Sequence, residues 1–352
     1  MKVGFYSDSI KFDGDVLEKK GIGGSESALV NITREWKRNN PDDEITIYNN
    51  NTGKYQEYNG VIWKSILDFN LEVRTFNLDV IISLRDPKIF YLPYIDAKLK
   101  CLWSQDIMNE SRLIDLQKNK YAIENIDIIF SNSKFSYNDL KKGFPNSDIR
   151  ILLNGYNKDF IHNIKKEDIA IWGSTPFRGT QYLLELWPKI YERCTNNNIY
   201  PKLKIYGGMD LYHQSNNQFS NIYNVLSKMI NTEICGSIPQ KKLFEEMNKA
   251  RLLLYPCDYI ETSCMIMIES MSCGVWPIST NIGALNELII NDKTGNIING
   301  SPRDKEYKEK FIEYAVNGFI NKNKPNTDHL GTWNDRAKEM RKIILEKLNG
   351  NL

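Results

Sequence analysis

The sequence feature that most constrains the fold is a series of short apolar runs separated by longer amphipathic stretches. In the first half, the runs are VGFY (3–6), EITIY (44–48), DVIISL (79–84), LKCLW (99–103) and DIIFSN (127–132). Runs of this length are typical of buried strands, and the amphipathic stretches between them are typical of helices. Strands that alternate with helices predict a parallel sheet covered by helices on both faces.

The series starts again after a polar stretch around residues 158–168. Its runs are IAIWG (169–173), LKIYG (203–207), EICG (233–236), RLLLYP (251–256) and VWPIS (275–279). A chain of 352 residues with 41% hydrophobic composition is globular and too long for one ordinary core. We therefore predict two Rossmann-like domains, at 1–160 and 168–325, followed by a C-terminal segment, 326–352, with a helix over about 332–348.

Charge and cysteine content exclude several classes of function. The 46 Lys and Arg nearly balance the 44 Asp and Glu, so the net charge of +2 provides no broad basic field for nucleic acid. No stretch of about 18 apolar residues and no signal-peptide pattern are visible. The six cysteines show no close pairs of the metal or redox type, which predicts a cytoplasmic protein with reduced, mostly buried thiols. We expect all three histidines to lie on the surface.

The first motif that suggests chemistry is GIGGSES, residues 21–27. Its glycines allow backbone amides to approach a ligand, Ser25 can cap the helix that follows, and a helix N-terminus favours an anion. We expect a phosphate- or anion-binding loop formed by Gly23, Gly24, Ser25 and Glu26. The alternative is a flexible loop with an ordinary helix cap. A dinucleotide site fits poorly, because Glu26 stands in place of the third glycine of that fingerprint.

The second motif follows the run RLLLYP and contains two carboxylates eight residues apart. Glu261 lies in a loop and Glu269 inside the next helix, where an apolar run would bury it. A buried carboxylate needs hydrogen-bond donors, and ribose hydroxyls would supply them. The residues expected to bind a diphosphate at the start of this helix are Thr262, Ser263, Cys264 and Met265, with the first two as candidate caps. The alternative is a solvated Glu261 and a Glu269 bonded to protein groups.

With these motifs the chain resembles, over nearly its whole length, the family 4 retaining glycosyltransferases of GT-B fold, also described as glycosyl transferases group 1. GIGGSE resembles the Gly-Gly-x-Glu acceptor loop, and Glu261 and Glu269 match the Glu-x7-Glu motif. Residues 272–278 match the small-x-Gly-x-Pro stretch, and residues 282–295 resemble the closing segment. The resemblance implies an α/β chain with two doubly wound Rossmann-like domains facing a central cleft, and a last helix that returns to the N-domain.

The resemblance also implies roles for single residues. Glu269 would hold the donor ribose, Glu261 would lie beside the donor sugar, and Arg178, which precedes a glycine, would neutralise the leaving diphosphate. We further expect Gly173 and Gly207, at the ends of two predicted strands, beside the donor. The reaction would be of the hexosyltransferase type: it would move a sugar from a UDP- or GDP-linked donor to a glycan or small hydroxyl acceptor, with retention and without cofactor or metal.

Two departures from the family pattern concern charge and proton transfer. The family carries a second diphosphate-binding basic residue a few positions before Arg178, where this chain has the sequence GSTP (173–176). Gln105 stands where many members have a histidine. A glutamine is not a general base, so either Asp106 takes that role or Gln105 only orients the sugar. The alternative for Gln105 and Asp106 is a helix-capping turn.

Other functions remain as alternatives. A nucleotide-sugar epimerase of the same fold needs acids and a histidine in the cleft, which the scarce histidines disfavour. A catalytically inactive sugar-binding module is suggested by the missing basic residue and by Gln105. The match of residues 13–15 to Asp-x-Asp is expected by chance in a chain with this many aspartates, so we predict no metal site. A membrane-surface role for the basic side of the last helix is a further, weaker alternative.

Overall fold

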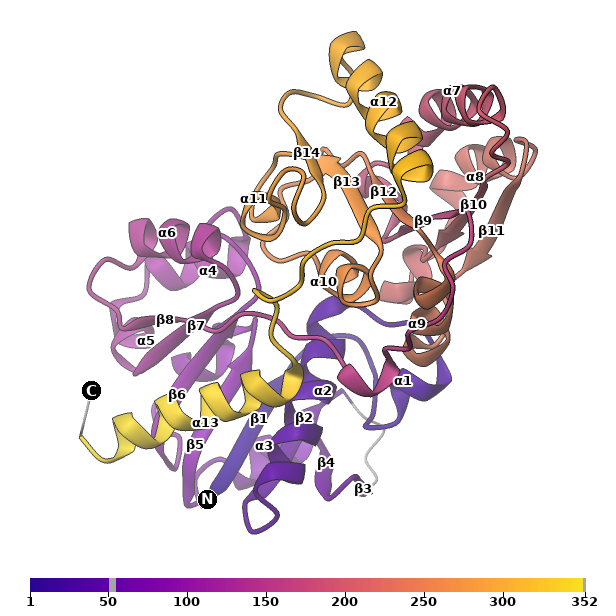
Figure 1. Ribbon diagram of the computed structural model, residues 1–352. Coiled ribbons are helices and arrows are strands. Elements are labelled where there is room, and N and C mark those ends of the chain that lie inside the picture. Colours follow the sequence, from indigo (N-terminus) through magenta and orange to yellow (C-terminus); the bar gives the residue numbers. More distant parts are fainter. Residues whose placement is uncertain (51–54, 351–352) are drawn as a thin grey trace. The chain divides into compact units, whose positions relative to one another are not determined.

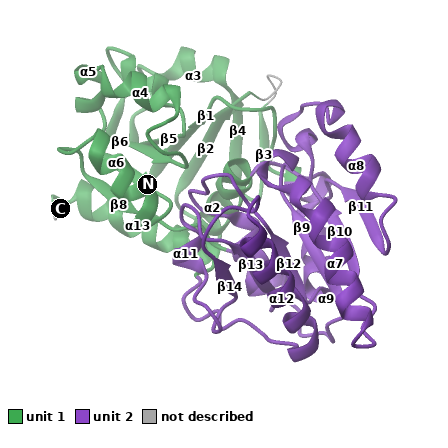
Figure 2. Cartoon of the chain, turned by 90° about the horizontal axis from the view of Figure 1, so that it is seen from above, with its two compact units in different colours: residues 1–16, 24–155, 331–352 green, residues 17–23, 156–330 purple. Residues whose placement is uncertain are grey.

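The computed structural model describes residues 1–50 and 55–350, which form two compact units (Figure 2). The first unit comprises residues 1–16, 24–155 and 331–352, and the second comprises residues 17–23 and 156–330. Each unit is built around its own sheet. Because each unit has its own buried sheet, the apolar runs of the sequence occur in two series.

The sheet of the first unit has, within the described residues, eight strands in the order β3-β4-β2-β1-β5-β6-β7-β8. All neighbours are parallel except β3 and β4. The strands are β1 (Lys2–Ser7), β2 (Glu44–Asn49), β3 (Gln56–Tyr58), β4 (Val61–Ser65), β5 (Leu78–Leu84), β6 (Ala97–Ser104), β7 (Ile128–Ser131) and β8 (Ile149–Ile151). The five strands expected in this half are present. Short strands toward the two ends of the sheet, β3, β4 and β8, were not predicted, because none of them has more than three consecutive apolar residues.

Helices cover this sheet (Figure 1). They are α2 (Gly24–Asn39), α3 (Ile66–Glu72), α4 (Ser111–Gln117), α5 (Lys120–Glu124), α6 (Lys134–Gly143) and α13 (Trp333–Leu348), with a 3-10 turn η1 (Pro87–Tyr91). The short helix α1 (Val16–Lys19) starts at the boundary between the units. The strands β1 and β5 at the centre of the sheet are almost wholly buried, which agrees with their continuous apolar composition.

The C-terminal helix α13, yellow in Figure 1, packs against α2 and β6 in the first unit. Thr332 caps it and forms a reciprocal capping box with Asp335, which explains why the helix begins at Trp333. Its apolar stripe of Trp333, Ala337, Met340 and Ile344 is buried. Helical spacing of apolar residues in the sequence therefore corresponds to a real packing face.

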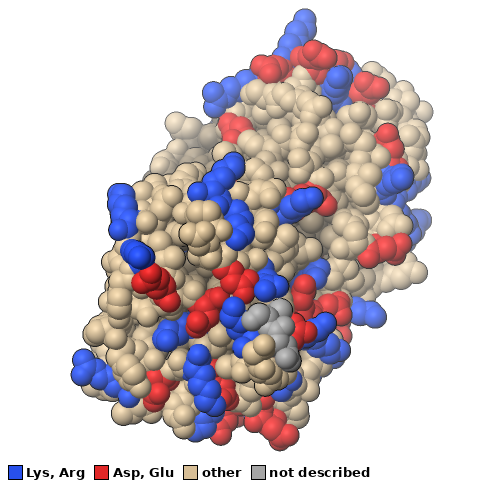
Figure 3. Space-filling view, turned by 90° about the vertical axis from the view of Figure 1, so that its left-hand side faces the viewer, with Lys and Arg blue, Asp and Glu red and all other residues tan. Residues whose placement is uncertain are grey.

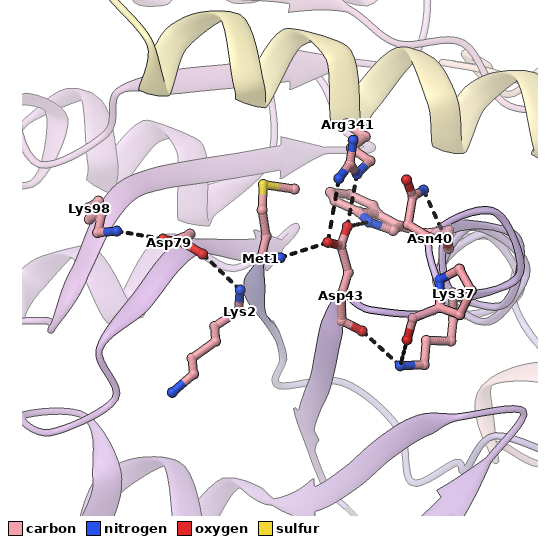
Figure 4. Close-up of polar contacts among 10 residues, drawn as sticks. Met1, Lys2, Lys37, Asn40, Asp43, Asp79, Lys98 and Arg341 are labelled. Carbon is pink, nitrogen blue, oxygen red and sulfur yellow. Dashed lines mark hydrogen bonds and ion pairs between the residues drawn. The ribbon is translucent and has the colours of Figure 1, made fainter.

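A buried carboxylate anchors α13 electrostatically (Figure 4). Asp43, between α2 and β2, accepts hydrogen bonds from the Met1 ammonium at 2.6 Å, Trp36 Nε1 at 2.8 Å and Arg341 Nε at 2.8 Å. Burial alone would raise the pKa of Asp43, but these hydrogen bonds outweigh it and lower the pKa to about 2. The start of β1, the end of α2 and the middle of α13 therefore meet at one negative charge.

The second unit contains, among its described residues, a fully parallel six-stranded sheet in the order β11-β10-β9-β12-β13-β14. Its strands are β9 (Ile169–Gly173), β10 (Lys202–Tyr206), β11 (Thr232–Gly236), β12 (Leu252–Tyr255), β13 (Trp276–Thr280) and β14 (Asn296–Ile298). The expected five are present, and the unpredicted β14 is a three-residue edge strand. The order reverses at β9, between β10 and β12, and ligands of doubly wound sheets bind at the carboxyl ends of strands at such a point.

Helices flank this second sheet as well. They are α7 (Leu183–Thr195), α8 (Ser220–Leu226), α9 (Gln240–Lys249), α10 (Met265–Ser272), α11 (Leu285–Leu288) and α12 (Lys305–Asn321). The 3-10 turns are η2 (Lys158–Phe160), η3 (Pro176–Arg178), η4 (Thr180–Tyr182), η5 (Met209–Tyr212) and η6 (Asn217–Phe219). α10 follows β12 and packs against α9 and β13.

Residues 17–23 belong to the second unit. The predicted single boundary near residue 160 would have placed them in the first. Gly21 lies so close to Leu211 and Ser237 that a Cβ would stand 3.0 Å from each side chain. Lys20 Nζ lies 2.9 Å from His213 Nε2. The sequence shows no pattern for this docking, because the contacts join segments about 190 residues apart.

The surface carries both signs of charge side by side. On the face shown in Figure 3, Lys and Arg alternate with Asp and Glu rather than forming one large patch. All three histidines are exposed, and the described cysteines are free thiols of which five are buried, as predicted. In the described part of the chain, no helix is both long and apolar enough to cross a membrane.

Candidate functional site

The loops after β9 and β12 bring Arg178 and Glu261 together. Arg178 Nη1 donates to both carboxylate oxygens of Glu261, at 2.5 and 2.6 Å. Only 3% of Glu261 is exposed, so the alternative of a solvated Glu261 is wrong. Burial alone would lower the pKa of Arg178, but the adjacent carboxylate raises it above its ordinary value. The guanidinium therefore stays charged and compensates for the buried carboxylate.

Tyr255 and Ser174 extend this pair into a hydrogen-bonded network. Tyr255 is the last residue of β12, and its phenol lies 2.7 Å from Glu261 Oε1 and 3.4 Å from Ser174 Oγ. Burial raises the pKa of Tyr255 well above its usual value, so the phenol stays neutral and donates. Sequence reasoning missed Tyr255, although a polar tip at the end of the apolar run RLLLYP was the available signal. Ser174 stands beside the place where the resembled family carries its second basic residue.

Glycines let these loops approach one another at backbone distance. Gly179 has φ +129°, and a Cβ there would lie 2.2 Å from the Pro256 carbonyl oxygen. Gly207 has φ +89°, and its Cβ would lie 2.3 Å from the Ser174 carbonyl oxygen. A side chain at Gly173 would meet Ile266 of α10 at 3.1 Å. These glycines hold the loop after β9 against its neighbours, so their packing role is visible independently of any donor.

An exposed aromatic pair borders the buried network. The Arg178 guanidinium lies 4.4 Å from the Tyr259 ring centroid and 5.7 Å from that of Phe177. The two rings contact each other edge to face at 5.5 Å, and more than a third of each residue is exposed. The guanidinium that binds Glu261 therefore also makes a cation–π contact with the Tyr259 ring. The sequence analysis did not single out either aromatic residue.

The helix α10 begins one residue later than a cap at Ser263 would require. Its N-cap is Cys264, which makes no side-chain capping bond, so the prediction that Thr262 or Ser263 caps this helix is wrong. The preceding turn is instead fastened by its backbone: the Ala284 amide donates to the Glu261 carbonyl at 2.7 Å. Gly283, at φ +59°, allows that approach, because a Cβ would lie 2.2 Å from the same carbonyl. Tertiary contact therefore replaces the local cap.

Glu269 lies inside α10 and is 5% exposed, as the apolar run around it predicted. Gln240 Nε2, from the first residue of α9, donates to its Oε1 at 2.8 Å. Burial raises the pKa of Glu269 to about 7, and the hydrogen bond from Gln240 opposes that rise. Gln240 was not among the residues expected from the sequence, because nothing local distinguishes it from a solvent-exposed helix residue.

In the first unit, Asp106 follows β6 and is held by arginines. Arg85 donates to its carboxylate through Nε at 3.0 Å and Nη2 at 2.7 Å, and Arg112 Nε lies 3.6 Å away. Arg85 has φ +64°, a conformation that a non-glycine residue adopts only at a cost. A general base at Asp106 would have to exchange these bonds for a proton, which makes this arrangement poorly suited to that role.

Gln105, next to Asp106, is one of three buried amides at the ends of adjacent strands. Its Oε1 accepts from Asn132 Nδ2 at 3.0 Å and from Asn154 Nδ2 at 3.4 Å. Asn132 follows β7 and Asn154 follows β8. The alternative of a helix-capping turn is wrong, because α4 is capped at Glu110. The sequence analysis missed both asparagines.

The glycine loop is divided between the units. Gly23 belongs to the second unit and Gly24 to the first, where α2 begins. Ser25 therefore lies in the first turn of α2, and the prediction that it precedes and caps the helix is wrong. Glu26 is 3% exposed, and its Oε2 has no hydrogen-bond partner in the described chain. A buried carboxylate oxygen at a helix N-terminus, favoured there by the helix dipole, is suited to accept a hydroxyl donor.

Comparison with known sequences finds a family match in the second half of the chain. Residues 158–326 match the family model described as glycosyl transferases group 1. An uncharacterized glycosyltransferase of Methanocaldococcus jannaschii is 27% identical over 210 residues, which cover 58% of this chain and 54% of that protein. The chain thus spans about half the length of this curated relative.

Solved structures resemble the whole chain. Sucrose-phosphate synthase of Thermosynechococcus elongatus superposes with a TM-score of 0.73 at 12% identity, covering 99% of each chain. Anabaena HepE, in complex with UDP and glucose, gives 0.67 at 11% identity over 98% of this chain and 100% of its own. WaaG, a glycosyltransferase of lipopolysaccharide biosynthesis, gives 0.63 at 12% identity over 97% and 95%. The chain therefore has the GT-B fold of two Rossmann-like domains, and its residues 158–326, which include the Arg178–Glu261 pair and Glu269, match the glycosyl transferases group 1.

Proposed function

We propose that the chain is a glycosyltransferase that moves a sugar from a nucleotide-sugar donor to a hydroxyl of a glycan or other small acceptor, with retention of anomeric configuration. The observation that carries the proposal is the buried Arg178–Glu261 pair at the carboxyl ends of β9 and β12, inside the segment that matches the family. HepE, solved with UDP and glucose, supports a nucleotide sugar as the donor class.

The chemistry of the reaction explains why a guanidinium and a carboxylate are needed together. Breaking the bond between the anomeric carbon and the diphosphate oxygen develops positive charge on the sugar and negative charge on the diphosphate. Arg178 would stabilise the diphosphate, and its buried Nε has no partner among the described residues, so a donor group is available. Glu261, held by Arg178 and Tyr255, would order sugar hydroxyls near the developing cation.

The donor nucleotide would be held through Glu269. This carboxylate is buried, and one of its oxygens is engaged by Gln240, so ribose hydroxyls are suitable donors to the other oxygen. The amides at the start of α10, from Cys264 and Met265, would meet the diphosphate. We propose UDP or GDP as the nucleotide, since both present the same ribose diphosphate to these groups.

On the acceptor side, we propose that Glu26 binds an acceptor hydroxyl and that Gln105 orients a sugar. In a retaining transfer of this kind, the acceptor oxygen attacks on the face that the diphosphate leaves. One carbon–oxygen bond breaks, another forms, and the acceptor proton passes to a phosphate oxygen of the leaving diphosphate. No protein base is then required, which agrees with Asp106 being held by Arg85 and with Gln105 in place of a histidine.

A catalytically inactive sugar-binding module is the second candidate. It is favoured by the stretch GSTP (173–176), which has no positive charge where the family carries its second basic residue, so a single guanidinium would have to stabilise the leaving group. Slow hydrolysis of the bound nucleotide sugar by the purified protein would exclude it, because a binding module leaves the donor intact. An epimerase is disfavoured because His162, His213 and His329 are all exposed.

Thermal unfolding in the presence of a panel of nucleotide sugars tests the proposal first. A ligand that binds the folded state raises the melting temperature. The true donor should therefore raise the melting temperature of the protein more than nucleotide sugars with a different base or sugar do. The coupling constant of the anomeric proton in the product, measured by NMR, then tests retention. An inverted product would refute the mechanism, and a panel without any stabilising nucleotide would refute the function.

A further inference from the structure

Gln240 is a buried polar residue to which the proposed function assigns no role. It is the first residue of α9, follows Pro239, and is 8% exposed. Its Nε2 lies 2.8 Å from Oε1 of Glu269, which belongs to the facing helix α10. Both side chains are buried and belong to different helices, so the hydrogen bond requires that the two helices hold them at a fixed distance. The contact is therefore a defined feature of the fold and not a contact between mobile surface side chains.

Because Glu269 is buried, the hydrogen bond from Gln240 affects whether its carboxylate is ionised. Burial disfavours a carboxylate and raises the pKa of Glu269 to about 7; the bond from Gln240 is the effect that counteracts it in the described structure. No charged side chain contributes. Without Gln240, the buried carboxylate would have no donor to favour its ionised form.

Charged groups on the packed elements are engaged elsewhere. On α9, Lys241, Lys242 and Glu245 are exposed. Glu246 pairs with Lys204 and Lys249 at the opposite end of that helix. At the end of α10, Lys166 Nζ donates to the carbonyl oxygens of Met247 and Cys273, and Cys273 carries a buried thiol. The sequence of β13, WPIST, contains no titratable side chain.

We propose that Gln240 is a positioning residue for donor binding: its amide holds Glu269 Oε1, so that Oε2 is oriented to accept the donor ribose hydroxyls. This inference rests on the proposed function, in which Glu269 is the ribose ligand. It adds that the strength of nucleotide binding near neutral pH is set by a residue of α9 that itself need not touch the nucleotide.

The direction of the pH dependence follows from the chemistry of hydroxyl donors. An ionised carboxylate accepts hydroxyl hydrogen bonds more strongly than a protonated one. Affinity for the donor should therefore be highest above the pKa of Glu269 and fall as the pH decreases through about 7. Removing the Gln240 amide takes away the bond that lowers this pKa, so the fall in affinity should move to higher pH.

The experiment is titration calorimetry with a nucleotide sugar between pH 5.5 and 8.5, where the bases of the two ligands below stay largely neutral. UDP-glucose or GDP-mannose is used, whichever binds the wild-type protein, because their diphosphate diesters do not titrate in this range. Gln240→Met, of similar shape but without an amide, should shift the fall in affinity upward by about one pH unit, which is about fivefold weaker binding at pH 7 and about tenfold weaker binding at pH 5.5. At pH 8.5 its affinity should return to within about threefold of wild type, since the carboxylate is then mostly ionised in both proteins.

Matched variants separate this effect from others. Lys241→Gln changes the charge of the neighbouring exposed residue and should leave the pH profile unchanged. Glu269→Gln removes the titrating group, so its binding should be weak and independent of pH. If Gln240→Met does not fold, Gln240→Glu keeps size and polarity and should shift the profile in the same direction through repulsion between the two carboxylates.

Two results would overturn the inference. One is a Gln240→Met profile with the wild-type midpoint, and the other is an affinity loss that is equal at every pH, which indicates a merely structural role. Failure of the underlying function looks different: Glu269→Gln would then bind the donor as wild type does, with the same pH profile. A melting temperature of the unliganded variant close to that of wild type confirms that each comparison concerns folded protein.

Discussion

Replacement of Asp43 by Asn tests how strongly α13 is fastened to the first unit. The carboxylate is 3% exposed and accepts bonds from the Met1 ammonium, Trp36 and Arg341 (Figure 4). Lowering its pKa from 3.8 to about 2 corresponds to about 2 kcal/mol of stabilisation at neutral pH. Asn keeps the shape but removes the charge, which leaves Arg341 and the ammonium without their partner. We therefore expect the free energy of unfolding to fall by about 2–3 kcal/mol.

The stabilisation by Asp43 should be present at neutral pH and disappear in acid. A carboxyl group whose pKa is lower in the folded state stabilises the protein above the unfolded pKa, and the contribution is lost as the pH falls from about 4 toward 2. Denaturant unfolding of wild type and Asp43→Asn should therefore differ most at pH 5–8 and converge at the acid end. Asp42→Asn, one residue earlier and exposed, is the matched control and should change stability by less than about 0.5 kcal/mol.

Calorimetry can localise the effect. A loss of about 2–3 kcal/mol corresponds to a decrease in melting temperature of about 4–10 °C for a unit of this size. If the two units unfold in separable transitions, the decrease should affect the transition of the first unit. A difference between Asp43→Asn and wild type below about 0.5 kcal/mol, or one that persists undiminished to pH 2, would refute the reasoning.

The remaining predictions concern catalysis and the terminal helix. Glu261→Gln should lower turnover on the order of a hundredfold, for a loss of ~2.7 kcal/mol, and leave nucleotide affinity within a few-fold, because its interactions strengthen in the transition state; steady-state kinetics would contradict this if only donor affinity changed. Glu269→Ala should weaken nucleotide binding by ~1.5–3 kcal/mol, and unchanged calorimetric affinity in a folded variant would refute the ribose assignment. Activity should survive EDTA, since the positive charge is proposed to come from Arg178 and helix amides, and a metal-reversible loss would disprove that. Deleting residues 332–352 removes the buried stripe from Trp333 to Ile344 and should lower melting temperature and activity together; an active truncation of unchanged stability would show that α13 is dispensable.

The fold class could be predicted because local patterns in the sequence report which side of each segment faces a core. The continuous apolar runs correspond to strands buried on both faces, such as β1, β5 and β12, and the stripe of the last helix corresponds to a packed face. The burial of Glu269 follows in the same way, from the apolar residues that precede it in α10. The strands β4 (VIWKS) and β14 (NII) escaped prediction because they contain only two or three consecutive apolar residues, a pattern that loops and helices also show.

Only the tertiary structure decided which polar groups meet. Arg178 and Glu261 are 83 residues apart, and Gln240 lies 29 residues before Glu269, so no local spacing brings them into view. The same holds for Asp106 with Arg85 and for Gly21 against Ser237. Even the helix starts depended on such contacts, since the turn before α10 is fastened by Ala284 rather than by a hydroxyl cap. A periodic pattern of apolar residues shows which face of a helix or strand is buried. A hydrogen bond between distant residues depends instead on the order of the strands and on the path of the loops, and strand order and loop path produce no repeat in the sequence.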